Sequence, residues 1–155
     1  MRISYYGFDK RPHAGTLVVN ADAVTPMRQV FRRLRIARFP IRRIRPVTAY
    51  GASDSRSVRH DNTSAFNCRY AVAPGPKHWS EHAYGEAIDL DPRENPYLEN
   101  GPNSAGGGPF ADRYHVRRGM IVAGGPAVRA FDAVGWGWGG RWSAPDYQHF
   151  SVNGR

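Results

Sequence analysis

Cysteine is almost absent from this sequence, and long apolar runs are absent altogether. Cys68 is the only cysteine, so the chain can form no internal disulfide, and the redox compartment cannot be inferred from it. No apolar run is long enough to span a bilayer, and residues 1–6 are too polar for the apolar region of a secretory signal. We expect a soluble protein that is either made without a signal or has lost one.

A long linker rich in glycine, serine or proline is also missing, so we expect a single domain over residues 1–155. This length is sufficient for a core that needs neither disulfides nor a metal in order to fold. Hydrophobic residues make up 41% of the chain, which is slightly low, and the 17 glycines and 12 prolines indicate many turns. The composition predicts a loop-rich α+β domain.

Acidic residues are few relative to basic ones. The chain has 22 Lys and Arg against 13 Asp and Glu, a net charge of +9. Such a charge attracts polyanions, which include nucleic acid, anionic lipid and anionic cell-wall polymers. Many of the arginines fall within residues 28–45. The charge therefore indicates a class of partner rather than one partner.

The first forty residues predict a hairpin and a helix. Residues 3–20 alternate around a polar turn at residues 9–12, which favours a β-hairpin. Thr25 and Pro26 are typical of a helix start, with Thr25 as the N-cap. An apolar stripe follows at three- and four-residue steps, consisting of Met27, Val30, Phe31, Leu34 and Ala37. The opposite face carries Arg28, Arg32, Arg35 and Arg38. We interpret this face as solvated; the alternative is a binding surface for an anionic polymer.

The middle of the chain predicts a strand and a long loop. Residues 43–50 have a strand-like composition, and the polar residues 51–79 read as a loop long enough to be functional. Residues 93–118 read as a second excursion that walls a substrate groove.

Three strands and one helix are expected around and after these loops. Alternation in residues 87–91 sends Ile88 and Leu90 to the core and leaves Asp89 facing a site. A helix is expected from Pro126 to Gly135, and a tryptophan-rich strand over residues 136–142. In the last strand, Phe150 and Val152 are expected in the core.

Two histidines and a carboxylate suggest a metal site. His82 and Asp89 lie seven positions apart around a glycine turn, and His149 comes from the end of the chain. Three protein ligands leave zinc a fourth position for water, and Asp146 could act as the base for that water. In a straight strand Asp146 and His149 would face opposite sides, so we predict a bend at Asp146, next to Pro145.

Other readings of these residues stay open. The chain has six histidines, and a single histidine is more often a hydrogen-bonded structural residue than a ligand. Glu81, Glu86 and Asp91 are further carboxylates near the motif, of which the last two fit a loop or supporting role better. The tryptophans of residues 136–142 could stack on substrate, but a core or groove-wall position is the safer interpretation.

A wider pattern resembles one family of bacterial and phage zinc peptidases, the D-Ala-D-Ala carboxypeptidases and dipeptidases and the related L-alanyl-D-glutamate endopeptidases. The similarity extends over most of the sequence, including residues 50–54 and 62–69. It rests on three elements: Ser80-x-His82-x-x-Gly85-x-Ala87-x-Asp89, the Gly-Trp-Gly-Gly-Arg-Trp of residues 137–142, and Asp146-x-x-His149.

The resemblance implies a fold and a set of roles. The fold is α+β of the hedgehog/DD-peptidase-like kind, with a small antiparallel sheet that carries the metal and helices packed on one face. One zinc ion would be held by His82, Asp89 and His149, with Asp146 as general base. Ser80 would bind substrate or support the metal ligands, and Trp138 and Tyr147 are further candidate substrate contacts.

The sequence departs from the family at one position. Relatives often carry an arginine directly after the aromatic residue that ends the strand before the long loop, where it steadies the substrate carbonyl. Here Tyr50 is followed by Gly51, so Arg56 or Arg69 would take that role. We favour Arg69, which lies closer to the metal motif.

The expected function is hydrolysis of an amide in the stem peptide of bacterial peptidoglycan, at the cell wall, by a monomer. The bond is either D-Ala-D-Ala or L-Ala-D-Glu, and a compact phage endolysin and a trimmed exported enzyme both fit. One alternative is a non-catalytic zinc-containing cell-wall binding module, which the presence of Asp146 disfavours. A nucleic-acid binder is the other alternative, but no known DNA- or RNA-binding spacing accompanies the arginines.

Overall fold

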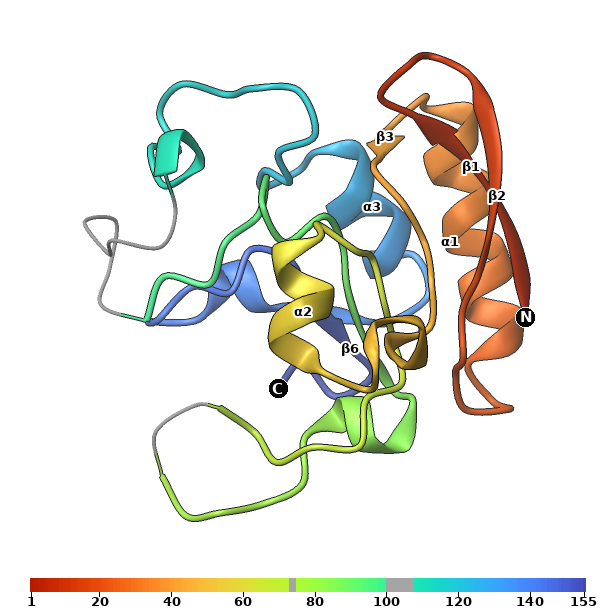
Figure 1. Ribbon diagram of the computed structural model, residues 1–155. Coiled ribbons are helices and arrows are strands. Elements are labelled where there is room, and N and C mark those ends of the chain that lie inside the picture. The colour runs from red at the N-terminus through yellow and green to blue at the C-terminus, as the bar shows by residue number, and fades with distance from the viewer. Residues whose placement is uncertain (73–74, 100–107) are drawn as a thin grey trace.

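The computed structural model describes residues 1–72, 75–99 and 108–155 and shows an α+β domain (Figure 1). The described chain contains two small three-stranded sheets and three α-helices, as the composition predicted. No helix in these residues is both long and apolar enough to cross a membrane. The elements are β1 (Arg2–Gly7), β2 (Pro12–Thr16), α1 (Val24–Ile36), β3 (Pro40–Ile41), α2 (Asp54–Arg59), β4 (Ala87–Asp89), α3 (Pro126–Asp132), β5 (Gly137–Trp138) and β6 (His149–Ser151), with 3₁₀ turns η1 (Val47–Tyr50), η2 (Glu81–Tyr84), η3 (Gly108–Phe110) and η4 (Gly139–Arg141).

The first sheet contains the predicted hairpin. Its strand order is β2-β1-β3, with β1 antiparallel to β2 and parallel to β3. The turn is closed by the Gly7 N–H, which donates to the Arg11 carbonyl oxygen at 2.8 Å. Helix α1 packs against β1, so this sheet and its helix form one side of the core (Figure 1).

Helix α1 confirms the predicted helix but not its predicted cap. Four residues of the predicted stripe are buried, whereas Ala37 is exposed because the helix ends at Ile36; the four arginines opposite are exposed, with Arg38 beyond the helix end. The helix begins at Val24, because the Met27 N–H already donates to the Ala23 carbonyl at 2.9 Å. Thr25 therefore lies inside the first turn and is not the N-cap. The helix ends where Arg38 takes a left-handed conformation (φ 50°) and the Phe39 N–H returns to the Leu34 carbonyl at 2.9 Å.

Two predictions for the middle of the chain were wrong. The strand expected at residues 43–50 is replaced by an isolated bridge at Ile44 and the turn η1, because Pro46 has no N–H to continue a ladder. The loop expected at residues 51–79 contains helix α2. The Ser53 side chain caps α2 by accepting from the Arg56 N–H at 3.4 Å, and Asp54 lies in its first turn. Only Ser57 of α2 is buried, so the sequence has no apolar stripe from which this helix could be predicted.

The second sheet is antiparallel, with strand order β4-β6-β5. The strand expected over residues 136–142 has only the two residues of β5 before the chain turns through η4. The helix expected from Pro126 is α3, which ends at Asp132. Val152, expected in the core, is 46% exposed, because β6 ends at Ser151. Of the excursion at residues 93–118, residues 100–107 lie outside the described part of the chain.

Helix α3 joins the two halves of the core. It packs against both α1 and β5. Phe131 of α3 stacks on Phe150 of β6, with ring centroids 3.8 Å apart and planes 11° from parallel. Both rings are fully buried. The back of the second sheet is thereby covered, which leaves its other face for a site.

Candidate metal centre

Two neighbouring strands carry two of the three candidate ligands. Asp89 of β4 and His149 of β6 are direct partners in the antiparallel register, so their side chains lie on the same face. Ile88 and Phe150, the next pair in the register, point into the core. This is the side-chain alternation that the sequence predicted for Asp89, and it places a carboxylate beside an imidazole.

The third candidate ligand, His82, lies in the turn η2 directly before β4. The Ser80 side chain begins this turn by accepting from the His82 N–H at 3.3 Å. Gly85 ends it in a left-handed conformation (φ 69°), and a Cβ at this position would lie 2.6 Å from the Asn20 nitrogen. Only glycine satisfies both conditions. The serine and the glycine of the motif thus fold the turn that presents His82.

The three side chains form a buried cluster with the spacing of a zinc site. His82 Nε2 lies 3.2 Å from His149 Nδ1 and 3.2 Å from one carboxylate oxygen of Asp89, and the other carboxylate oxygen lies 3.3 Å from His149 Nδ1. Zinc bonds of about 2.0–2.2 Å in a tetrahedron place two ligand atoms roughly 3.3–3.6 Å apart. The observed separations fit that geometry, so the cluster could hold one ion.

Main-chain oxygens fix the outward-facing nitrogen of each imidazole. His82 Nδ1 lies 2.7 Å from the Ala65 oxygen, and His149 Nε2 lies 3.1 Å from the Arg155 oxygen. An oxygen of this kind only accepts, so each of these nitrogens must donate a proton. In the neutral ring, the nitrogen that faces the cluster then has a free lone pair, as a metal ligand requires.

The charges in the cluster favour an ionised carboxylate. Burial alone would raise the pKa of Asp89, but His82 and His149 hold that pKa well below its usual range. Burial would likewise lower the pKa of His82, but the Asp89 carboxylate outweighs burial and raises it. A cation placed between them would compete with these protons.

Asp146 lies beside the cluster because the chain bends before β6. The bend occurs at Tyr147 and Gln148 and is closed by the His149 N–H, which donates to the Asp146 carbonyl oxygen at 3.3 Å. Asp146 Oδ1 is buried without a hydrogen-bond partner among the described residues. Burial, and then the negative charge of Asp89, raise the pKa of Asp146 to about 7. Such a carboxyl group can exchange a proton near neutral pH.

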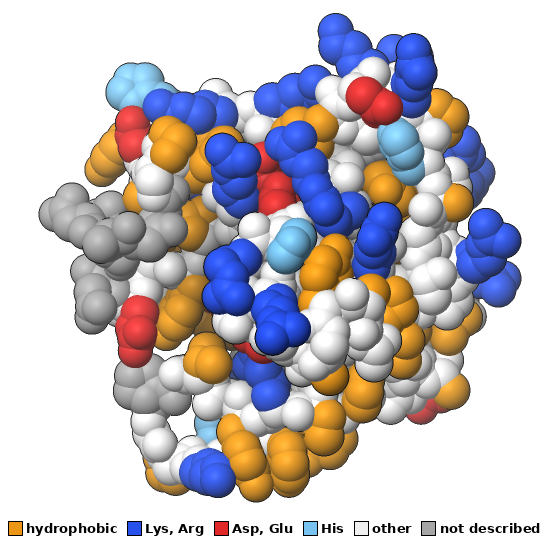
Figure 2. Space-filling model, in the orientation of Figure 1, with side chains coloured by type: hydrophobic (Ala, Val, Ile, Leu, Met, Phe, Trp, Pro, Cys, Tyr) orange, Lys and Arg blue, Asp and Glu red, His pale blue; other side chains and the backbone are white. Residues whose placement is uncertain are grey.

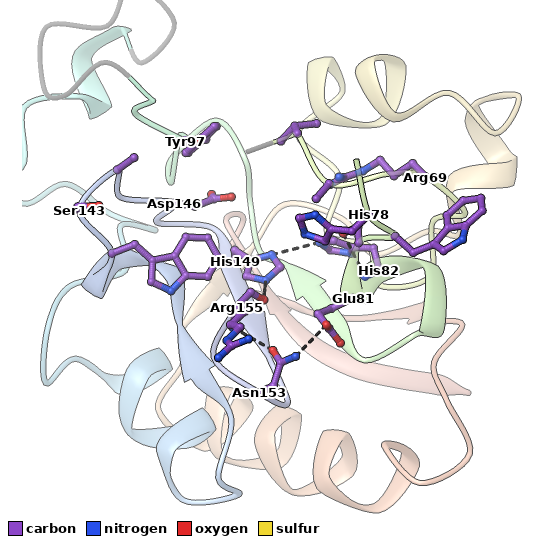
Figure 3. A pocket seen from close by; sticks show the side chains of 16 residues that line it. Arg69, His78, Glu81, His82, Tyr97, Ser143, Asp146, His149, Asn153 and Arg155 are labelled. Atoms are coloured by element: carbon purple, nitrogen blue, oxygen red, sulfur yellow. Dashed lines mark hydrogen bonds between the residues drawn. The ribbon is translucent and has the colours of Figure 1, made fainter. Parts of the chain in front are cut away.

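A pocket of about 560 Å³ opens over the cluster (Figure 3). His82 and His149 point toward one another at its base, with Asp146 near His149 and Arg69 on the wall near His82. Of the residues singled out from the sequence, the lining contains Arg69, Ser80, Glu81, His82, Asp146 and His149. Tyr97, from the excursion expected to wall a groove, and Trp142, from the tryptophan-rich stretch, also line it. Sequence reasoning did not assign a role there to Trp79, Asn153 or Arg155, which line it as well.

The structure separates the two candidate arginines. Arg69 lines the pocket, and its Nε donates to Asp54 at 3.2 Å. Asp54 also accepts from Asn67 Nδ2 at 2.6 Å, so one carboxylate of α2 steadies two residues of the following segment. Arg56 lies on α2 near Gly51 and is not part of the lining.

Two candidate substrate contacts lie away from the pocket lining. Trp138 is buried in the core, with its indole N–H bound to the Tyr147 carbonyl oxygen at 2.9 Å. The Tyr147 ring instead faces the Arg113 guanidinium at 4.0 Å. The carboxylates Glu86 and Asp91 are also outside the lining, as the sequence favoured. Trp138 therefore has the core position that was the safer of the two interpretations of the tryptophans.

A model of the family described as D-alanyl-D-alanine carboxypeptidase matches residues 74–152, just over half of the chain. No curated protein and no solved structure matches the chain. The match includes the turn η2, the second sheet and all three members of the metal cluster. Enzymes of this family depend on zinc and act on peptidoglycan at the cell wall. The chain therefore belongs to the D-alanyl-D-alanine carboxypeptidase family and is a zinc metallopeptidase.

Proposed function

We propose that this enzyme hydrolyses one amide bond in the stem peptide of peptidoglycan, with Asp146 as its general base. The observation that carries the proposal is the unpartnered, buried carboxylate oxygen of Asp146 next to a cluster of three metal ligands. A metal that only stabilised the fold would not need this group. A carboxyl group with a pKa near 7 matches the requirement of proton transfer at neutral pH.

The metal ligands and Asp146 have separate roles in this reaction. His82, Asp89 and His149 would hold zinc, which when bound lowers the pKa of water and polarises the scissile carbonyl. Asp146 accepts the proton of the attacking water as the water oxygen bonds to the carbonyl carbon. When the carbon–nitrogen bond breaks, Asp146 returns this proton to the leaving nitrogen. The products are a carboxylic acid and an amine, which at neutral pH are present as a carboxylate and an ammonium group.

Arg69 is the residue we assign to the substrate carbonyl. Its place on the pocket wall and its bond to Asp54 hold the guanidinium in a defined position. Arg56 lies outside the pocket lining, so we do not assign it this role. Ser80 caps the turn that carries His82, and this contact supports a structural contribution to the metal site.

Replacing Asp146 tests the catalytic proposal. Asp146→Asn and Asp146→Ala should lower the rate of hydrolysis of purified peptidoglycan by about 10²–10⁴-fold. Zinc content should not change, because Asp146 is not one of the three clustered ligands. Asp22→Asn, which removes an exposed carboxylate, is the matched control. Equal activity in the Asp146 variants and wild type would favour a non-catalytic zinc module instead.

The bond that is cut is D-Ala-D-Ala or L-Ala-D-Glu. The two bonds release different fragments, a single D-alanine in the first case and, in the second, a peptide that begins at D-Glu together with a glycan that keeps only its L-alanine. Mass spectrometry of the products from defined muropeptides distinguishes them. Release of a glycan that keeps only L-alanine would support a lytic, endolysin-like role, and release of D-alanine alone would exclude that role.

The basic surface supports attraction to anionic cell-wall polymers. Lys and Arg dominate the charged side chains on the face shown in Figure 2. On α1, the exposed Arg28, Arg32 and Arg35 form no ion pair with the described residues. Changing these three to Gln should weaken binding to cell walls that carry anionic polymers and leave binding to stripped walls unchanged. Equal binding of both proteins to both walls would contradict this.

A further inference from the structure

The last residues of the chain fold back against the metal cluster. The Asn153 side chain donates to Glu81 of η2 at 2.8 Å, and the indole of Trp142 donates to the Gly154 oxygen at 2.8 Å. A Cβ on Gly137 of β5 would lie 2.4 Å from the Gly154 Cα, so this segment packs closely on the sheet. Figure 3 shows Asn153 and Arg155 next to His149. The segment therefore connects η2, which carries His82, with the sheet that carries the other two ligands.

The main-chain oxygen of Arg155 is held in place at the end of this segment. It accepts from the Ser151 hydroxyl at 2.7 Å and lies 3.1 Å from His149 Nε2. Ser151 is fully buried, and the Arg155 N–H is bound to Asn153 Oδ1 at 3.0 Å. The oxygen is thus fixed from two directions before any metal binds.

This contact determines which nitrogen of His149 faces the cluster. An acceptor at Nε2 requires the proton there and leaves Nδ1 free, 3.3 Å from Asp89. Without the acceptor, the ring is free to place its N–H toward the cluster or to rotate away. The Ala65 oxygen accepts from His82 Nδ1 in the same way, but Ala65 lies in the middle of the chain and its oxygen cannot be removed by shortening the chain.

We infer that the Arg155 main-chain oxygen is the positioning group that fixes His149 as an Nδ1 ligand. The Arg155 side chain is not required for this effect. The inference rests on the metal site of the proposed function. It predicts that loss of the oxygen weakens metal binding, whereas loss of the guanidinium does not.

A variant that ends at Gly154 should bind zinc about 10–100-fold more weakly than wild type, the usual effect of losing the partner of a metal-ligating histidine. Arg155→Ala keeps the main-chain oxygen and should bind zinc as wild type does. Ser151→Ala removes one of the two contacts to the oxygen and should fall between them. Competition with a chelating dye gives these affinities, and circular dichroism of each metal-free variant checks that it folds.

Nitrogen NMR of zinc-loaded wild type tests the inference without any variant. The exchangeable ring proton of His149 should be on Nε2, and the shortened variant should lose its hydrogen-bonded signal. A proton on Nδ1 in wild type, or equal zinc affinity of the shortened chain and Arg155→Ala, would overturn the inference. Wild type that binds zinc with the His149 ring proton on Nε2 but does not hydrolyse peptidoglycan would contradict the proposed function and support the role of Arg155.

Discussion

A buried acidic cluster around Arg42 leads to a quantitative prediction about how stability depends on pH. Arg42 pairs with Asp61 at 3.3 Å and with Glu94 at 2.9 Å, and its main-chain N–H donates to Asp91 at 2.8 Å. Three carboxyl groups thus surround one guanidinium. One oxygen of Glu94 and one of Asp91 are buried without a hydrogen-bond partner among the described residues. The cluster has more negative charge than its arginine can balance.

Burial, and then the neighbouring Asp61 carboxylate, raise the pKa of Glu94 from 4.5 to about 7. A raised acid pKa means that folding favours the protonated form. The contribution to stability is therefore fully present below about pH 4.5 and is lost as the pH rises through 7. At about 1.4 kcal/mol for each pKa unit, the loss from this one group is roughly 3 kcal/mol.

Glu94→Gln tests this magnitude, because glutamine has the shape of the protonated acid but cannot ionise. We expect the variant to match wild type near pH 5 and to be more stable at pH 8 by up to roughly 3 kcal/mol. Urea unfolding in the presence of a chelator, at several pH values, measures the difference. Glu99→Gln, at an exposed position, is the control and should show no such trend. A difference between Glu94→Gln and wild type that is the same at pH 5 and pH 8 would refute the reasoning.

Further predictions concern the core, the pocket and the metal. Phe131→Ala should lower the free energy of unfolding by about 3–5 kcal/mol, because it leaves a cavity against Phe150; Phe131→Leu should cost less, as urea titration would show. Arg69→Lys should reduce hydrolysis with zinc content unchanged, whereas Arg56→Lys should behave as wild type in the same kinetic assay. Gly85→Ala should weaken zinc binding, because its Cβ would displace the turn that presents His82; a dye competition that finds unchanged affinity would contradict this. Free zinc at 100 times its dissociation constant should stabilise the metal-free protein by about 2.7 kcal/mol, which thermal unfolding with and without a chelator measures.

The sequence predicted the side-chain directions of β4 correctly because two kinds of information agreed there. Alternation placed Ile88 in the core and Asp89 in the site, and the motif spacing identified His82 as a partner. The bend before His149 followed from a conflict between strand alternation and the need for Asp146 on the same side. Strand alternation alone predicts side-chain directions in such a segment, because each residue of a strand can face only one of two sides of the sheet.

Other features could not be predicted because they depend on distant parts of the chain. Helix α2 is short and polar, and its Asp54 pairs with Arg69, fifteen residues away. The role of Trp79 as a pocket wall depends on its stacking against Tyr70, at 4.2 Å. The contact between His149 Nε2 and Arg155 joins a side chain to a main-chain oxygen, and no pattern of side chains encodes the position of that oxygen.

Because β6 is short, it limits where residues can be inserted near the metal cluster. The strand has three residues, and successive side chains point alternately to the pocket and to the ring of Phe131. One residue inserted between Asp146 and His149 would shift β6 by one position. The Phe150 ring would then point to the metal cluster, and the His149 imidazole would point into the apolar core. The interval of two residues in Asp-x-x-His is thus set by the pairing register of β6 with β4, and insertions are expected to be tolerated only before Asp146.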